Sequence, residues 1–174
     1  MKARDSPVTN ASISISEIKN CFKKEGQKRW QKRWDYGRDG RYTYSLFPKV
    51  KTGGYKSFCE KNVETKIIRL QLGTTLLREH MHKIMPVFYE DPNCDCGQDR
   101  ATIEHYMLYC PLHKTNRDKL SRAIECVLLK HTKKQCWDLS LQVLIGKPDE
   151  LTCDIIPQVR QAVSAFIRET AIDI

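Results

Sequence analysis

The chain has 174 residues, enough for one ordinary domain with appendages and too few for two full domains. Hydrophobic residues make up 40% and charged residues 29%, a balance that is typical of a folded protein and excludes a wholly disordered one. No stretch approaches the roughly 18 apolar residues of a membrane span, and no apolar run of signal-peptide length follows the first residues. We therefore expect no membrane contact and a location in the cytoplasm or nucleus.

The net charge of +9 is concentrated near the beginning of the chain. Residues 1–60 carry 14 Lys/Arg against 6 Asp/Glu, a net charge of +8, whereas residues 61–174 carry 16 against 15, a net charge of +1. Such an asymmetry favours a polyanionic partner, because each cation that meets a phosphate releases a condensed counterion. The alternative is a basic surface that only faces water.

The first predicted element is a helix that begins at Ser14-Ile15-Ser16-Glu17, which has the Ser-x-x-Glu form of a capping box. Ile18 and Phe22 continue it with helical spacing. Gly26 weakens its middle, so the segment is either one helix or two helices that meet there.

A short extended segment is predicted next, over Tyr42–Phe47, because these residues are β-prone and Pro48 follows them. Residues 49–56, with two adjacent glycines, are typical of a linker. The sequence therefore predicts two parts: a basic, tryptophan-containing segment with a helix and a short strand over residues 1–56, and a helical domain over residues 57–174.

The second part begins with a predicted helical hairpin. From Ser57 the apolar residues recur at three- and four-residue steps until Gly73, which ends the first helix. A second helix over residues 76–84 stops ahead of Pro86, since proline lacks the amide donor and restricts the residue before it. Further helical patterns cover residues 112–128 and 155–172, and a short apolar piece covers 139–145. The fold class we expect is a small, mainly α domain.

Four potential metal ligands lie within 17 residues, in the pattern Cys94-x-Cys96-x8-His105-x4-Cys110. Three thiolates and one imidazole form the set of soft ligands that tetrahedral zinc prefers. In a reducing compartment such a cluster indicates a metal site rather than disulfides. The alternative is a group of unrelated buried thiols with a surface histidine.

The spacing predicts a knuckle at residues 91–113 that holds one structural zinc ion, because four protein ligands leave no open position for a reactive water. A helix that begins at Thr102 has to end or bend near Cys110 to point His105 and Cys110 inward, since they are five residues apart. Gly97 relieves the tight one-residue gap between the first two cysteines if it adopts a positive φ.

A basic and aromatic segment is the candidate nucleic-acid interface. Its cations can neutralise phosphates, and its tryptophans can stack on unpaired bases of RNA or DNA if they are exposed. The alternative is that the two tryptophans, four residues apart, form a buried helical stripe. The candidate residues are Lys28, Arg29, Trp30, Lys32, Arg33, Trp34, Arg38 and Arg41.

No set of residues predicts catalysis. A nuclease or polymerase that uses two metal ions needs converging carboxylates, and the acidic residues here are scattered without a known spacing motif. We therefore expect the chain not to be an enzyme and to have no small-molecule substrate.

Several motifs occur together in a familiar order: Trp30-Gln31-x-x-Trp34-Asp35, Gly40-Arg41-x-Thr43-Tyr44, Arg69-Leu70-Gln71-Leu72-Gly73, Cys94-x-Cys96-Gly97, Thr102-x-x-His105 and Cys110-Pro111. In this order, over roughly residues 13–125, the chain resembles the C-terminal region of non-LTR (LINE-like) retrotransposon polyproteins, which follows the reverse transcriptase and ribonuclease H domains.

The resemblance implies that the four Cys and His residues are zinc ligands. It also implies an accessory module that engages RNA or DNA together with the rest of a retroelement machinery. The catalytic carboxylates of the polymerase and the ribonuclease H are missing, so a non-catalytic fragment is expected. The alternative is a structural or protein-interaction remnant, truncated or domesticated, that has no nucleic-acid role.

Overall fold

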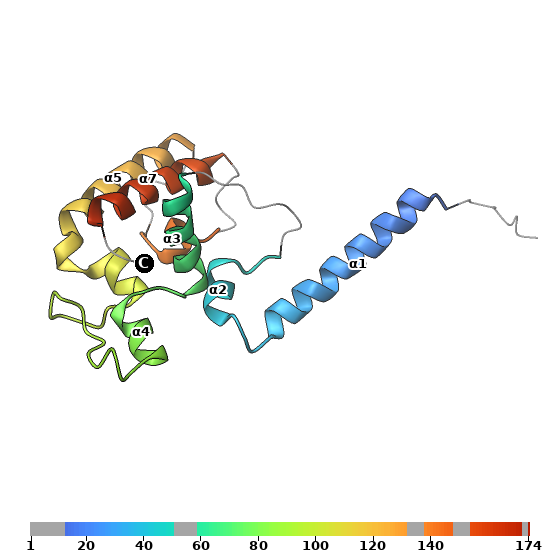
Figure 1. Ribbon diagram of the computed structural model, residues 1–174. Helices are drawn as coiled ribbons and strands as arrows, with labels where there is room; N and C mark the ends of the chain where they lie inside the picture. The colour runs from blue at the N-terminus through green and yellow to red at the C-terminus, as the bar shows by residue number, and fades with distance from the viewer. Residues whose placement is uncertain (1–12, 51–58, 132–137, 148–153, 172–173) are drawn as a thin grey trace, which may run out of the picture.

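The computed structural model describes residues 13–50, 59–131, 138–147, 154–171 and 174. Within these ranges the chain is mainly helical, as predicted, and forms no strand beyond one isolated antiparallel bridge between Asn93 and Arg100. Figure 1 shows a body of packed helices and one helix, α1 (Ile15–Tyr36), that extends away from it.

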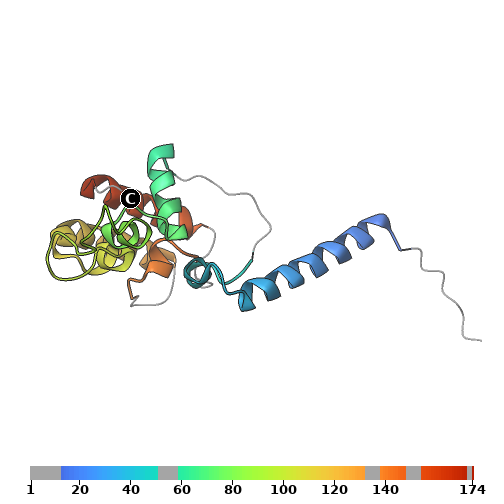
Figure 2. The same cartoon turned by 60° about the horizontal axis from the view of Figure 1, so that its bottom comes forward.

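Helix α1 begins at the predicted capping box. The Ser14 hydroxyl accepts a hydrogen bond from the Glu17 amide, and the Glu17 carboxylate accepts one of 2.7 Å from the Ser14 amide. The helix runs through Gly26 without a break, so the alternative of two helices is wrong. None of its residues is buried, and it points away from the body in both views (Figures 1 and 2).

The predicted extended segment is instead a short helix, α2 (Arg41–Leu46), so the prediction of a strand over Tyr42–Phe47 is wrong. Gly40 precedes it with a φ of 67°, a conformation that glycine adopts at little cost. The Tyr42 hydroxyl donates a hydrogen bond of 2.8 Å to the carbonyl of Leu70, and Leu46 is buried. These distant contacts outweigh the local β preference. The predicted linker lies largely outside the described residues, in 51–58.

Helices α3 (Lys61–Leu72) and α4 (Arg78–Ile84) occupy the two predicted helical stretches. Gly73 ends α3 with a φ of 75°, and α4 ends before Pro86. However, α3 packs mainly against α2 and α7 rather than against α4, so the predicted hairpin is not the packing unit. Val87 and Phe88, beyond α4, are both 81% exposed.

The core lies between the last helices. Helix α5 (Lys114–His131) packs along α7 (Ile155–Thr170) (Figure 1), and the short helix α6 (Leu141–Leu144) contacts α7 and α2. Both longer helices follow the predicted apolar spacing, but Ala171 is exposed and ends α7 with a φ of 49°. The apolar core residues that are at most 2% exposed include Ile67, Leu70, Met107, Ile124, Leu128, Leu144, Ile145, Val163, Phe166 and Ile167.

One buried cation joins α6 to α7. The Arg160 guanidinium donates hydrogen bonds to the carbonyls of Leu144, Ile145 and Gly146, at 2.7, 2.5 and 3.0 Å. These carbonyls lie at the end of the short helix, where carbonyls lack donors within the helix, and an unpaired carbonyl is costly in a buried position. The Ile145 carbonyl also accepts a hydrogen bond of 2.8 Å from the side-chain amide of Gln71. The amide of Lys147 donates to the carbonyl of Leu46 at 3.0 Å, so the same region also holds the end of α2.

Candidate metal centre

The first two candidate ligands lie on a tight loop. The Cys94 amide donates to the Asp99 carbonyl at 2.9 Å, and the Gly97 amide donates to the Cys94 carbonyl at the same distance. Gly97 has a φ of 70°, which confirms that this position uses the left-handed conformation. The turn brings the sulfurs of Cys94 and Cys96 to the same side of the loop, within 4.8 Å of each other.

The other two candidate ligands lie at the ends of one unusual helical turn. Thr102 caps it, since its hydroxyl accepts a hydrogen bond of 3.0 Å from the His105 amide. The turn over His105–Tyr109 is a π-helix, in which the Cys110 amide donates to the His105 carbonyl, five residues back, at 2.7 Å. In an α-helix, residues five apart diverge by about 140°. The wider π turn brings the two side chains to one side, and the helix ends there, as predicted.

The four ligand atoms form a compact group, all within 4.8 Å of one another. The sulfurs of Cys94 and Cys110 are 3.7 Å apart, and the sulfur of Cys96 is 3.2 Å from Nε2 of His105. Around a tetrahedral ion with metal–sulfur bonds of about 2.3 Å, neighbouring sulfurs are about 3.8 Å apart. The group could therefore hold one metal ion, and its geometry fits a tetrahedral one.

The ligands differ in their surroundings. His105 and Cys110 are buried, whereas Cys94 and Cys96 are partly exposed. Burial raises the pKa of the Cys94 thiol to about 11, whereas the amide of Gln98, which donates to the Cys96 sulfur at 3.5 Å, lowers the pKa of that thiol. A metal that binds Cys94 near neutral pH must therefore displace its proton.

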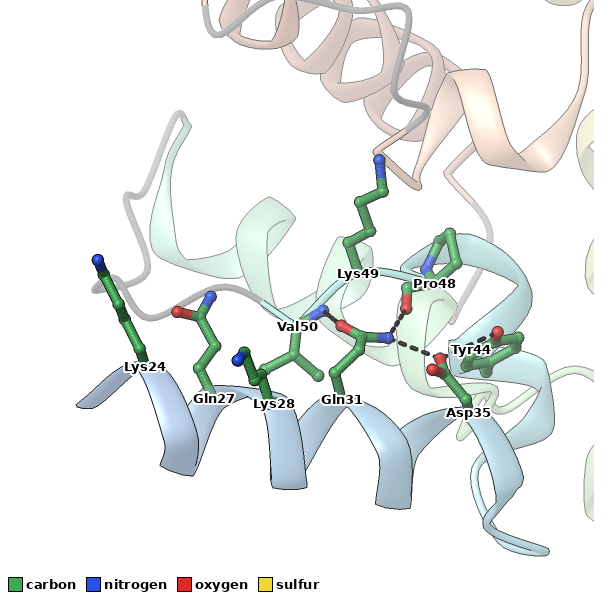
Figure 3. Close-up of a pocket in the computed structure, with 9 residues that line it drawn as sticks. All are labelled: Lys24, Gln27, Lys28, Gln31, Asp35, Tyr44, Pro48, Lys49 and Val50. Carbon is green, nitrogen blue, oxygen red and sulfur yellow. Dashed lines mark hydrogen bonds between the residues drawn. The ribbon is translucent and has the colours of Figure 1, made fainter. Parts of the chain in front are cut away.

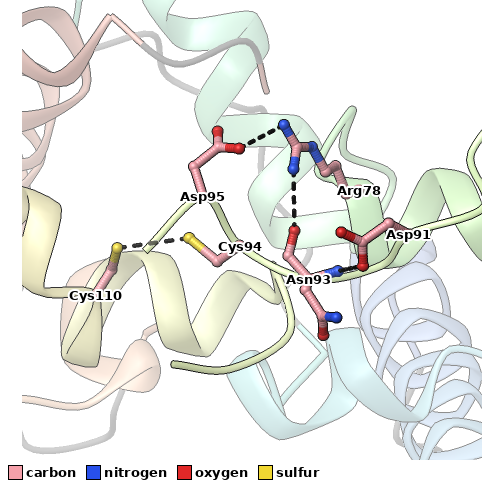
Figure 4. Close-up of polar contacts among 6 residues, drawn as sticks. All are labelled: Arg78, Asp91, Asn93, Cys94, Asp95 and Cys110. Atoms are coloured by element: carbon pink, nitrogen blue, oxygen red, sulfur yellow. Dashed lines mark hydrogen bonds and ion pairs between the residues drawn. The ribbon is translucent and has the colours of Figure 1, made fainter. Parts of the chain in front are cut away.

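Helix α4 holds the cysteine loop from outside (Figure 4). The Arg78 guanidinium forms an ion pair of 2.6 Å with Asp95 and donates to the carbonyl of Asn93 at 3.3 Å. On the other side, Arg117 of α5 donates to the carbonyl of Cys110 at 2.9 Å. Neither arginine could be predicted from the sequence, because each meets its partners only in the folded chain.

The π turn that carries His105 also contacts the core. Tyr106, next to His105, lies 5.5 Å from the ring of Phe166 and 5.1 Å from that of His113, and its hydroxyl bonds to Thr170 at the end of α7. Burial raises the pKa of Tyr106 to about 12. Among the residues that the structure describes, these four ligands form the one Cys, His or carboxylate group compact enough for a metal.

The candidate nucleic-acid residues fall into two groups. Six of them are exposed on α1 and in the turn after it, and Trp30 is 52% exposed. Trp34, which is partly buried, and Arg41, which is exposed, instead hold the junction between α1 and α2. The indole of Trp34 donates to the Phe47 carbonyl at 2.8 Å, while Arg41 donates to the carbonyls of Trp34 and Asp35 and lies 4.3 Å from the Tyr44 ring.

Comparison of the chain with models of protein families, with curated proteins and with solved structures found no match. None of the helices in the described ranges has both the length and the apolar character that are needed to cross a bilayer.

Proposed function

We propose that Cys94, Cys96, His105 and Cys110 hold one Zn²⁺ ion, and that this ion is structural. The supporting observation is the compact group of three sulfurs and one imidazole nitrogen. Four protein ligands fill a tetrahedral shell, so no position remains for a water that could react. The ion would lock the cysteine loop to the π turn, and through Tyr106 to the end of α7.

Metal analysis of the purified chain tests this proposal. We expect one zinc ion per chain, and Co²⁺ in its place should give the charge-transfer and ligand-field absorption of a tetrahedral thiolate site. Cys110→Ser should lose the metal, whereas Cys126→Ser is the matched control, because Cys126 is exposed on α5. Full zinc retention by Cys110→Ser would contradict the assignment.

We further propose that the chain is a non-catalytic nucleic-acid-binding module, of the retrotransposon accessory type that its motifs resemble. The observation that carries this proposal is the basic helix α1, which buries none of its own residues. Its cations outnumber its three acidic residues, Glu17, Glu25 and Asp35. These cations are Lys19, Lys23, Lys24, Lys28, Arg29, Lys32 and Arg33.

Fluorescence anisotropy of labelled single-stranded RNA and DNA, titrated with the zinc-loaded chain over a salt series, tests the second proposal. We expect the logarithm of the affinity to fall linearly with the logarithm of the salt concentration, because phosphate contacts release counterions. An absence of binding even at low salt would reject a nucleic-acid role.

A second candidate function is protein interaction, and one observation favours it. Ile15, Ile18 and Phe22 recur at helical spacing on the outer half of α1, where they are 72%, 44% and 75% exposed. An apolar stripe on a helix is the usual surface for docking on another protein. If the partner is a nucleic acid, Phe22→Ser should leave the affinity for RNA unchanged. If the partner is a protein, the same substitution should abolish binding of that protein.

A further inference from the structure

A groove lies between α1 and the segment that follows α2 (Figure 3). It has a volume of about 710 Å³, within the range of small-ligand sites. Lys24, Gln27 and Lys28 line it from α1, and Pro48 and Val50 line it from the opposite side. None of these residues except Lys28 belongs to the interface predicted from the sequence.

Gln31 builds the groove. Its side-chain amide donates to the carbonyl of Pro48 at 2.8 Å and to the Asp35 carboxylate at 2.6 Å, and its oxygen accepts from the Val50 amide at 2.7 Å. These bonds fix the segment 48–50 alongside α1, as Figure 3 shows. The shape of the groove is therefore fixed by hydrogen bonds between its two walls.

The two ends of the groove differ in charge, and Lys49 adds a third cation on the wall that Pro48 and Val50 form. Lys24 and Lys28 lie toward one end, with the amide of Gln27 between them (Figure 3). At the other end the Asp35 carboxylate accepts hydrogen bonds from Gln31 and from the Tyr44 hydroxyl, at 2.6 and 3.3 Å. An anion is therefore favoured at the lysine end. Val50 and Pro48 provide an apolar wall against which a flat ring could pack.

We infer that this groove binds a single-stranded stretch of nucleic acid, with backbone phosphates on Lys24 and Lys28 and a base against Val50 and Pro48. Single strands are bound by cationic grooves that follow the backbone and by side chains, usually aromatic, on which bases stack. Here Val50 and Pro48 offer an apolar wall in place of an aromatic ring. The groove holds a few nucleotide units at most, so a duplex would not enter it. This inference rests on the proposed nucleic-acid function and specifies where the strand lies.

The test compares variants of the full, zinc-loaded chain by anisotropy with a labelled single-stranded RNA. The groove variant is Lys24→Glu with Lys28→Glu. The matched control is Lys61→Glu with Lys114→Glu, which makes the same charge change at exposed positions on α3 and α5 that belong neither to the groove nor to the basic helix α1. We expect the groove variant to lose at least about tenfold in affinity, and the control to lose less than about threefold.

Gln31→Ala adds a test without any change of charge, because it removes the hydrogen bonds that fix the groove. We expect it to lower RNA affinity several-fold, with zinc content and helix content unchanged. Equal losses in the two lysine variants, or full affinity in Gln31→Ala, would overturn the groove while leaving the nucleic-acid function intact. Failure of the unmodified chain to bind would reject the proposed function itself. Equally tight binding of a duplex would overturn the single-strand assignment.

Discussion

The amide of Cys110 donates a hydrogen bond of 2.7 Å to the carbonyl of His105, five residues earlier in the chain. This π turn is what allows a histidine and a cysteine at this spacing to face one ion. Wide turns of this kind are rare and often mark functional sites. Here the turn fits the five-residue spacing of the two candidate ligands, and Pro111 begins a separate 3-10 turn directly after it.

Removal of the metal should destabilise the chain. His105 and Cys110 are buried beside the core residue Met107, so a metal-free site leaves polar groups in an apolar environment. We expect a strong zinc chelator to lower the midpoint of thermal unfolding, as measured by calorimetry. Added Zn²⁺ should restore it, whereas Mg²⁺ should not, because thiolates are poor ligands for magnesium. An unchanged midpoint in a chain shown to be metal-free would contradict a structural role.

Gly97→Ala should weaken metal binding by about 1–2 kcal/mol, because a residue with a side chain resists a φ of 70°. No atom lies within 4 Å of the added Cβ, so the effect is one of backbone conformation alone. Competition with a colorimetric zinc chelator measures it. Gly26→Ala is the control: it should leave metal affinity unchanged and stabilise the middle of α1 by about 0.5–1 kcal/mol.

Arg160→Met should lower the free energy of unfolding by roughly 3 kcal/mol, since the buried carbonyls of Leu144 and Gly146 lose the guanidinium donor, whereas that of Ile145 keeps the Gln71 amide. Chemical denaturation of the zinc-loaded chain measures this loss. Arg168→Met, on the exposed part of the same helix, should change the stability by less than about 0.5 kcal/mol. Similar losses of stability for the two substitutions would show that the hydrogen bonds from Arg160 to the end of α6 do not stabilise the fold.

We expect Trp34 to contribute to stability and Trp30 to contribute to RNA binding. Trp34→Ala removes an indole that donates to the Phe47 carbonyl and packs edge-on against Tyr44, so it should destabilise the junction between α1 and α2. Trp30→Ala should leave stability unchanged and lower RNA affinity by about 1–3 kcal/mol if the exposed ring stacks on a base. Thermal melts and anisotropy on both variants distinguish the two roles.

Stability should fall at alkaline pH, in part because of Tyr42. Burial raises its pKa from 10 to about 12. The folded chain therefore keeps this proton while the unfolded chain releases it, and the stabilisation present below pH 10 is lost as the pH rises toward 12. Urea denaturation over this range should show a shallower decline for Tyr42→Phe than for the unmodified chain. Identical slopes would show that Tyr42 does not carry the effect.

The sequence predicted those features whose causes are local. The capping box at Ser14, the ends of α3 and α4, and the loop conformation at Gly97 all depend on residues within a few positions of one another. The four candidate metal ligands could also be predicted from the sequence, because they lie within 17 residues and three thiols with one imidazole are a distinctive ligand set.

Features that depend on distant partners could not be predicted. Helix α2 replaces a predicted strand because Tyr42 bonds to Leu70, 28 residues later. Nothing near Arg160 in the sequence indicates that its guanidinium serves carbonyls 14 to 16 residues earlier. The groove could not be predicted from the sequence for the same reason, because Gln31 contacts Pro48 and Val50 only in the folded chain.

The junction around α2 has a further consequence for how α1 acts. Gln31 and Trp34 fasten the inner half of α1, while Leu46 is buried in the core and its carbonyl accepts from Lys147. These contacts hold the inner half of α1 at a fixed position relative to the core, so the helix is not a flexible tether of variable length. A nucleic-acid strand bound along it would lie at one fixed distance from the helical core, so a second contact made by that core would add to the affinity only for ligands of matching span.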